Sequence, residues 1–207
     1  MARPLKALLS QEIIGQAAIQ LVDSGRELQV VPLAKQLGVS VSSLYHHVDG
    51  REGIIRAMRQ VMVSEYKSPE RSAADWRETL RREVEQTWIM YVSHPRVLQL
   101  LITVVINEPD ALSFYEVLAE ALERAGLPDE EILTTIEAIE AFSIGAALDA
   151  LSPEVLIDPA HSDGKLATLL PHHSSGEVRN REVFERGLEL IIDGIAARVA
   201  AAAARSN

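Results

Sequence analysis

The chain has 207 residues, of which 47% are hydrophobic and 24% are charged, and it contains no cysteine. A chain of this size and composition can bury a core, which excludes wholesale disorder, and it can form no disulfide, thiolate metal site or cysteine nucleophile. The first nine residues lack the apolar core of a signal peptide, and the longest apolar run, residues 100–106, is too short to span a bilayer. We therefore expect a cytoplasmic globular protein with no membrane partner.

The net charge of −10 is distributed unevenly along the chain. Residues 1–60 contain seven Lys and Arg against five Asp and Glu, which leaves +2 there and −12 in residues 61–207. A mildly basic N-terminal part followed by an acidic body is typical of a DNA-binding module joined to a domain that does not touch DNA.

Helical periodicity dominates the chain and no stretch alternates as a strand would, which predicts an all-α fold. Capping residues, glycines and prolines mark the helix ends, such as Ser10 before the first helix and Gly25 after it. The expected helices span residues 10–23, 32–37, 41–47, 51–66, 75–94, 95–106, 110–125, 129–151 and 181–204. Residues 152–180 collect proline, glycine, serine and histidine with little periodicity and are expected to form a loop.

A candidate helix-turn-helix lies between Leu33 and Val48. Small Ala34 allows two helices to cross closely, and Gly38 can adopt the left-handed conformation of a tight turn. The apolar residues of this stretch point inward, which leaves on the second helix an outward face of small or hydrogen-bonding side chains that fits a major groove. That face consists of Ser40, Val41, Ser42, Ser43, Tyr45 and His46. Two short amphipathic helices around a glycine also occur in ordinary bundles, so the motif alone leaves both readings open.

Residues 10–58 resemble the DNA-binding domain of the TetR family of bacterial repressors, and the string from Leu44 to Val48 is typical of its tetracycline-repressor branch. The resemblance implies an N-terminal three-helix bundle with a helix-turn-helix over residues 1–50, joined to a larger helical ligand-binding and dimerisation domain over residues 51–207. It also implies DNA contacts at Lys35, Ser40, Val41, Ser42, Ser43, Tyr45, His46, His47 and Arg51. The sequence departs from the family where Val30-Val31-Pro32 replaces polar residues and Asp49 replaces a lysine, so no operator sequence is transferred.

The resemblance continues more weakly through the body, over Trp76-Arg77, Ser93-His94, residues 141–149 and residues 184–194. It implies a homodimer in which helices around the last two segments meet. Their small residues would let helices approach closely at such an interface. These residues are Gly145, Ala146, Gly187 and Gly194.

Apolar and aromatic side chains of the body either line a ligand pocket or form an ordinary core, and the residues alone leave both open. The resemblance favours a pocket for a small-molecule effector, with contacts at Trp88, Tyr91, His94, Ile102, Val105, Phe114, Leu118, Phe142 and Asp149. By position His94 and Asp149 match metal-holding residues of tetracycline repressors. We expect them instead to end a helix and to face solvent, and we predict no metal and no cofactor. The loop histidines His161, His172 and His173 are expected to be solvated.

Two other functions compete with that of a repressor. The sequence contains no glycine-rich phosphate loop, no Gly-x-Ser-x-Gly and no His-Glu-x-x-His, so we expect no catalysis. A helical interaction protein that has lost DNA binding stays open because the second helix begins atypically. The expected function is a homodimeric repressor that binds double-stranded operator DNA and responds to a small molecule.

Overall fold

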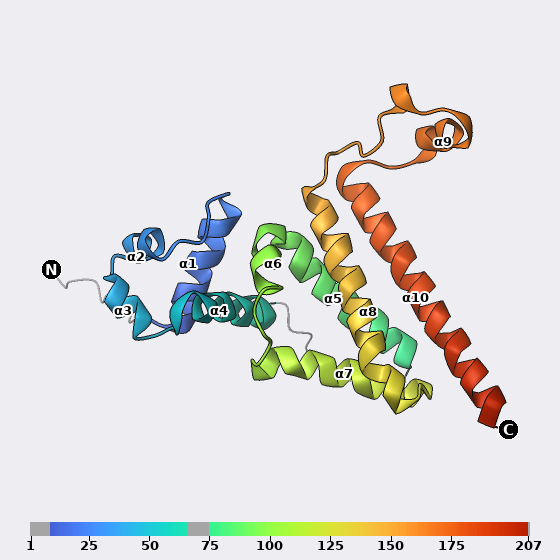
Figure 1. The fold of residues 1–207 in the computed structure, drawn as a ribbon, viewed down its shortest axis with the longest axis horizontal. Coiled ribbons are helices and arrows are strands. Elements are labelled where there is room, and N and C mark those ends of the chain that lie inside the picture. The colour runs from blue at the N-terminus through green and yellow to red at the C-terminus, as the bar shows by residue number, and fades with distance from the viewer. Residues whose placement is uncertain (1–8, 66–74, 207) are drawn as a thin grey trace. The chain divides into compact units, whose positions relative to one another are not determined.

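The computed structural model describes residues 9–65 and 75–206, and these ranges contain helices and no strand (Figure 1). The predicted all-α fold is therefore confirmed. The chain divides into two compact units, and each is described by itself. Of the described residues, the first unit holds 9–65 and 96–113, and the second holds 75–95 and 114–206. The boundary predicted at residue 50 falls inside the first unit.

The helices follow the predicted order. The first unit contains α1 (Gln11–Asp23), α2 (Val30–Leu37), α3 (Val41–Tyr45), α4 (Gly50–Glu65), most of α6 (Pro95–Leu101) and the start of α7 (Pro109–Ala125). The second unit contains α5 (Trp76–Ser93), the rest of α7, α8 (Asp129–Leu148), α9 (Gly164–Leu169) and α10 (Gly176–Ser206). None of the described helices is both long and apolar enough to cross a membrane.

The core of the first unit forms where α1 packs on α4. Ser10 caps α1 as predicted, because its Oγ accepts a hydrogen bond from the backbone N–H of Ile13 at 3.2 Å. Ile14 and Ile54 are fully buried at this interface. The two backbones approach so closely at Gly15 that a Cβ atom there would lie 2.5 Å from the carbonyl oxygen of Ala57. Glycine is thus required at residue 15 for contact between α1 and α4.

Replacing Gly15 with alanine is expected to lower the free energy of unfolding by about 1–3 kcal/mol, since the new methyl group overlaps a backbone atom that cannot rotate away. Urea denaturation followed by circular dichroism measures the change. The adjacent, exposed Gln16 provides the control, and Gln16→Ala is expected to change stability by no more than about 0.5 kcal/mol. Equal stability of the two variants would contradict the close packing.

The second unit is organised by α8, which packs against α5 and α10. An aromatic stack joins these three helices: the rings of Trp88 and Phe184 lie 4.3 Å apart, and those of Phe184 and Phe142 lie 5.8 Å apart. Gly187 makes room for this stack, because a Cβ atom there would overlap the Phe142 ring. At Gly145 and Gly194, by contrast, an added Cβ would meet nothing within 4 Å.

The structure differs from the prediction by five residues at two helix ends and by three residues or fewer at the others. α6 ends at Leu101 rather than at residue 106. The Leu101 carbonyl accepts the N–H of Val104 at 3.3 Å in a turn, and the carbonyls of Leu101 and Val104 also accept hydrogen bonds from the Arg59 side chain. α10 begins at Gly176, five residues earlier than expected, and α9 lies inside the predicted loop. Arg179 and Asn180, in the first turns of α10, hold the end of α8 and so order the beginning of α10.

Candidate DNA-binding surface and effector site

The turn between α2 and α3 has the geometry that the sequence predicts. Gly38 has a φ of 67°, in the left-handed region that glycine tolerates. The N–H of Gly38 donates to the Lys35 carbonyl at 3.1 Å and that of Val39 to the Ala34 carbonyl at 3.0 Å, which satisfies the end of α2. Ser40 then caps α3, its Oγ accepting from the N–H of Ser43 at 3.0 Å. These contacts fix the direction in which α3 leaves the turn.

One face of α3 is buried and the other is exposed. Leu44 is fully buried and Val48 nearly so, which holds the helix against the rest of the first unit. The outward face predicted to enter the major groove, here called the reading face, is exposed at Ser40, Ser42, Tyr45 and His46 and half-buried at Val41 and Ser43. His47, which follows it, is half-buried. Lys35 and Arg51 are exposed on the neighbouring helices. The structure therefore gathers the predicted DNA contacts around one short helix.

Gln11 makes a hydrogen bond beside α3 that the sequence does not predict. Its Nε2 atom donates to the carbonyl oxygen of His47 at 3.0 Å, which ties the start of α1 to the residues just after α3. An exposed glutamine in a first helical turn carries no sequence signal for such a bond. Its contribution is to limit movement of the reading face relative to α1.

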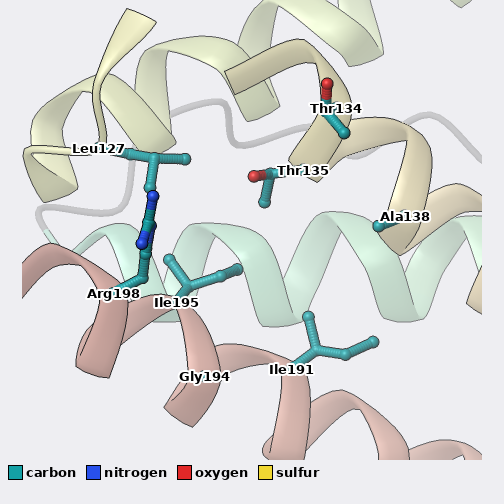
Figure 2. Close-up of a pocket in the computed structure, with 8 residues that line it drawn as sticks. All are labelled: Leu127, Thr134, Thr135, Ala138, Ile191, Gly194, Ile195 and Arg198. Atoms are coloured by element: carbon teal, nitrogen blue, oxygen red, sulfur yellow. The ribbon is translucent and has the colours of Figure 1, made fainter. Parts of the chain in front are cut away.

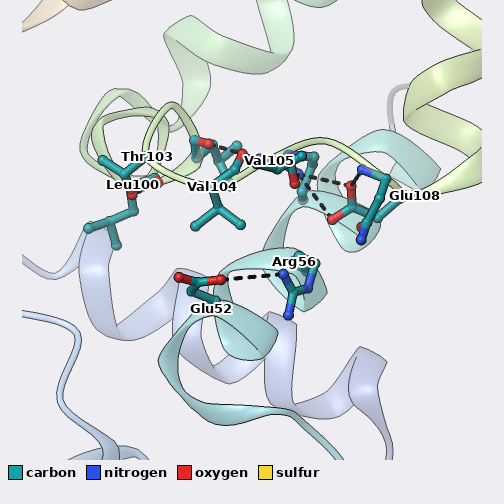
Figure 3. A network of polar contacts seen from close by, with 10 residues as sticks. Glu52, Arg56, Leu100, Thr103, Val104, Val105 and Glu108 are labelled. Carbon is teal, nitrogen blue, oxygen red and sulfur yellow. Dashed lines mark hydrogen bonds and ion pairs between the residues drawn. The ribbon is translucent and has the colours of Figure 1, made fainter.

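Arg59 forms a buried polar network with Leu101 and the segment that follows α6. Figure 3 shows three of its partners in that segment, Val104, Val105 and Glu108. The Nη1 atom of Arg59 donates to the two carboxylate oxygens of Glu108 at 2.8 and 3.1 Å and to the Val105 carbonyl at 3.2 Å. Its Nη2 atom donates to the carbonyls of Leu101 and Val104 at 2.8 and 2.7 Å. Arg59 is only 5% exposed. The sequence did carry a signal, because Arg59 interrupts the apolar stripe of α4 one turn after Ile55.

The nine predicted effector contacts are divided between the two units. Ile102 and Val105 lie in the first unit, with 53% and 80% of their surface exposed. In the second unit, Trp88 and Leu118 are buried in the core, whereas the other side chains are half-buried, namely Tyr91, His94, Phe114, Phe142 and Asp149. Trp88 and Phe142 are brought together through Phe184. Within the described residues the buried indole N–H of Trp88 has no hydrogen-bond partner.

Asp149 takes part in an ion pair that closes α8 against α10. Its Oδ2 atom accepts from Arg179 at 2.9 Å and from Asn180 at 3.2 Å. Burial alone would raise the pKa of Asp149, but hydrogen bonds from Arg179, Asn180 and Ser152 outweigh it and lower the pKa below the ordinary 3.8. His94 follows α5, and its backbone N–H donates to the Tyr91 carbonyl at 3.2 Å. In residues 9–65 and 75–206, no three acidic or histidine side chains are placed to share a metal ion.

Replacing Asp149 with asparagine is expected to lower the free energy of unfolding at pH 7 by about 2 kcal/mol, because the buried Arg179 loses its charge partner. A carboxyl with a lowered folded-state pKa stabilises the fold above its unfolded-state pKa, and this contribution disappears as the pH falls through the folded-state value. The difference from the wild type should therefore shrink between pH 5 and pH 3.

Urea denaturation at pH 7, 5 and 3 measures this dependence. Asp163→Asn is the control, since Asp163 is exposed and its side chain makes no capping bond to α9. A stability difference that stays constant over this pH range would contradict the role assigned to the Asp149 carboxylate.

A shallow apolar groove runs between α8 and α10 (Figure 2). It has a volume of about 320 Å³ and is lined by Leu127, Thr134, Thr135, Ala138, Ile191, Gly194, Ile195 and Arg198. Arg198 is held by the Glu131 carboxylate, with its Nε atom 2.7 Å from Oε2. Next to the lining residues in sequence, Leu133 and Leu190 are 63% and 64% exposed. Exposed leucines around an open groove are typical of a surface that another chain covers.

Comparison with known proteins gives consistent results. The tetracyclin repressor-like C-terminal domain model matches residues 68–199. The chain is 29% identical to the transcriptional repressor DrrR1 of Streptomyces coeruleorubidus over 157 residues, which cover 72% of this chain and 57% of that protein. It is 25% identical to a transcriptional regulator of Saccharopolyspora erythraea over 93% of this chain and 86% of the relative. The chain thus spans little more than half the length of DrrR1 and most of the second relative.

Solved structures of ActR from Streptomyces coelicolor have the same fold. Apo ActR is 25% identical, with a TM-score of 0.78 over 95% of this chain and 99% of ActR. ActR in complex with (S)-DNPA is 26% identical, with a TM-score of 0.74 over 92% and 98% of the two chains.

A helix-turn-helix with an exposed second helix, joined to a helical body, defines a class of DNA-binding transcriptional regulators. The chain belongs to the TetR family of transcriptional regulators within that class. The relatives named above are repressors and regulators, and the family predicted from the sequence is confirmed.

Proposed function

We propose that the protein is a homodimeric repressor that binds palindromic operator DNA through α3 and is controlled by a small-molecule effector. The observation that carries the proposal is the turn at Gly38, which buries Leu44 and leaves Ser42, Tyr45 and His46 exposed on one face. Hydroxyl and imidazole groups on an exposed helix suit contacts with base edges and phosphates.

The DNA contacts divide by chemistry. Ser40, Ser42, Ser43 and His46 offer hydrogen bonds to bases, Val41 offers an apolar contact to a thymine methyl group, and Tyr45 reaches a phosphate. Lys35, Arg51 and His47 lie at the edges of this set and contribute backbone contacts.

The dimer forms through α8 and α10. The groove between these helices, the exposed Leu133 and Leu190 beside it, and the open space at Gly145 and Gly194 all favour close approach of a second copy. A twofold interface buries each of these features twice, and it presents two reading helices to successive major grooves about 34–36 Å apart.

The effector site lies in the second unit and involves the predicted residues of that unit, Trp88 and Phe142 among them. The unpaired indole N–H of Trp88 in the described structure supports a ligand with a hydrogen-bond acceptor. ActR, a relative of this chain, is known in complex with the small molecule (S)-DNPA. Because the Asp149 carboxylate is engaged by Arg179, an effector held through a metal ion at His94 and Asp149 is disfavoured.

An effector changes DNA binding by moving α4, which is packed on α1. A change in the spacing of the two reading helices prevents both halves of the dimer from engaging together. An effector that favours the DNA-competent spacing acts as a co-repressor, and one that disfavours it acts as an inducer. The protein acts in the cytoplasm, where it meets its operator, and performs no catalysis.

A selection from random DNA fragments with purified protein, at low and at moderate salt, tests the proposal. We expect enrichment of a short palindrome and weaker binding as salt rises, because phosphate contacts release counterions. A folded dimer that enriches no sequence at either salt concentration would favour the alternative, a helical interaction protein without specific DNA binding.

A further inference from the structure

The helix that carries the reading face is too short to fix its own direction. α3 contains five residues, Val41–Tyr45, which form little more than one helical turn after the cap at Ser40. Buried Leu44 and, just after the helix, buried Val48 hold it against the rest of the first unit. Because apolar contacts have no preferred direction, these two side chains keep α3 on the core without fixing its rotation.

Gln11 supplies a directional contact at the end of α3. Its Nε2 atom donates to the His47 carbonyl oxygen at 3.0 Å, across 36 positions of the chain. Among the described residues, no backbone amide donates to the same oxygen. Gln11 is itself held in place, since it opens α1, which Ser10 caps and the fully buried Ile14 anchors in the core. The bond therefore joins the end of α3 to a fixed point of the first unit.

This bond lies at the surface, so its effect on position can be separated from its effect on stability. Gln11 is exposed and uncharged, and water can replace its amide at the His47 carbonyl, so losing the bond costs little stability.

Base recognition is more demanding than phosphate attraction. A displacement of about 0.5 Å takes an N–H···O bond out of its usual range of about 2.7–3.2 Å. Attraction to phosphates acts over several ångströms and tolerates such a displacement. A rotation of α3 should therefore weaken specific binding more than non-specific binding.

We infer that Gln11 is a positioning residue for sequence recognition: through the His47 carbonyl it holds the reading face in the orientation that contacts base edges. The inference rests on the function proposed above and concerns a residue outside the predicted DNA contacts. It assigns to Gln11 the preference for one sequence over another, rather than affinity for DNA in general.

The test compares Gln11→Met with the wild type in the full chain. Methionine has a similar length and helix propensity but no N–H donor. We expect affinity for the selected palindrome to fall by about tenfold, and affinity for a scrambled duplex of equal length to stay within about twofold of the wild type. Gln16→Met is the matched control, since it makes the same replacement at an exposed position of the same helix and should change neither affinity by more than about twofold.

Amide hydrogen–deuterium exchange of the DNA-free protein tests the hydrogen bond by itself. The amides of His46, His47 and Val48 donate to carbonyls of α3. They should exchange about threefold or more faster in Gln11→Met and at the wild-type rate in Gln16→Met. Unchanged exchange in Gln11→Met would overturn the idea that Gln11 holds the end of α3.

The two affinities separate this inference from the proposed function. An equal fall for the two duplexes in Gln11→Met would make Gln11 a phosphate contact or a residue needed for folding, and either result overturns the positioning role. Unchanged affinity for the palindrome overturns it as well. A wild-type protein that does not distinguish the two duplexes contradicts the proposed DNA recognition itself, and with it any role of Gln11 in recognition.

Discussion

Replacing Leu190 with glutamate is expected to separate the dimer and to weaken operator binding by at least about 100-fold. Leu190 lies on α10 beside the groove and is 64% exposed, as a residue covered by a second copy would be. Across a twofold axis the substitution buries two carboxylates that lack partners. A monomer then binds only one half-site. It loses the gain in affinity that comes from binding both half-sites together, which is a factor of about 10² to 10⁴.

Sedimentation equilibrium and fluorescence anisotropy with the selected operator measure the two effects. Leu112→Glu is the matched control, since Leu112 is 45% exposed and belongs to the first unit, whereas α8 and α10 belong to the second. We expect it to stay dimeric and to bind the operator within about threefold of the wild type. A Leu190→Glu protein that remains a dimer would contradict the proposed interface.

Replacing Ser42 with glutamate is expected to abolish specific binding, with a loss of about 100-fold or more, while leaving the fold intact. Ser42 is exposed in the middle of α3, so its replacement disturbs no core packing. The carboxylate would face the phosphates and the acceptor-rich base edges of the major groove. They would repel it, whereas the serine hydroxyl can form a hydrogen bond there.

Two further variants separate the effect of the added negative charge from the loss of the Ser42 hydroxyl contact. Ser42→Ala removes only the hydroxyl and should cost about tenfold or less, the value of one neutral hydrogen bond. Gln20→Glu adds the same charge at an exposed position on α1 and should have little effect. If Ser42→Glu binds the operator as tightly as Ser42→Ala, then α3 does not enter the groove.

Much of the fold was predictable because local signals agreed with one another. Ser10 caps α1, Gly38 adopts the left-handed turn, Asp75 caps α5 and the apolar stripes of the main helices face the core. Each of these depends on interactions within a few residues, which periodicity and capping rules describe. The family resemblance then supplied the order of the two functional parts.

The long-range polar contacts were not predictable in the same way. Arg59 binds the carbonyls of Leu101 and Val104, more than 40 positions along the chain, and Arg179 and Asn180 order the start of α10 through Asp149. Periodicity does not reveal such partners, so α6 was predicted too long and α10 too short. An arginine within an apolar stripe, as at Arg59, is nevertheless a visible sign that a buried partner exists.

The sequence predicts the location of the DNA contacts more closely than that of the effector contacts. The reading face follows from one short motif, and the structure places its residues around a single helix. The predicted effector contacts are spread over several helices, and the family resemblance is the ground for them. They include Trp88 and Leu118, which are buried in the core of the second unit. Sequence periodicity does not distinguish a side chain that lines a pocket from one that fills a core.

The most direct test of the central claim is the ratio of affinities for the selected operator and for a scrambled duplex of equal length, at one fixed salt concentration. We predict a ratio of about 10³ or more for the wild type. In Tyr45→Ala, which removes a proposed phosphate contact, both affinities should fall by a similar factor. Equal affinity of the wild-type protein for the two duplexes would contradict sequence-specific reading by α3.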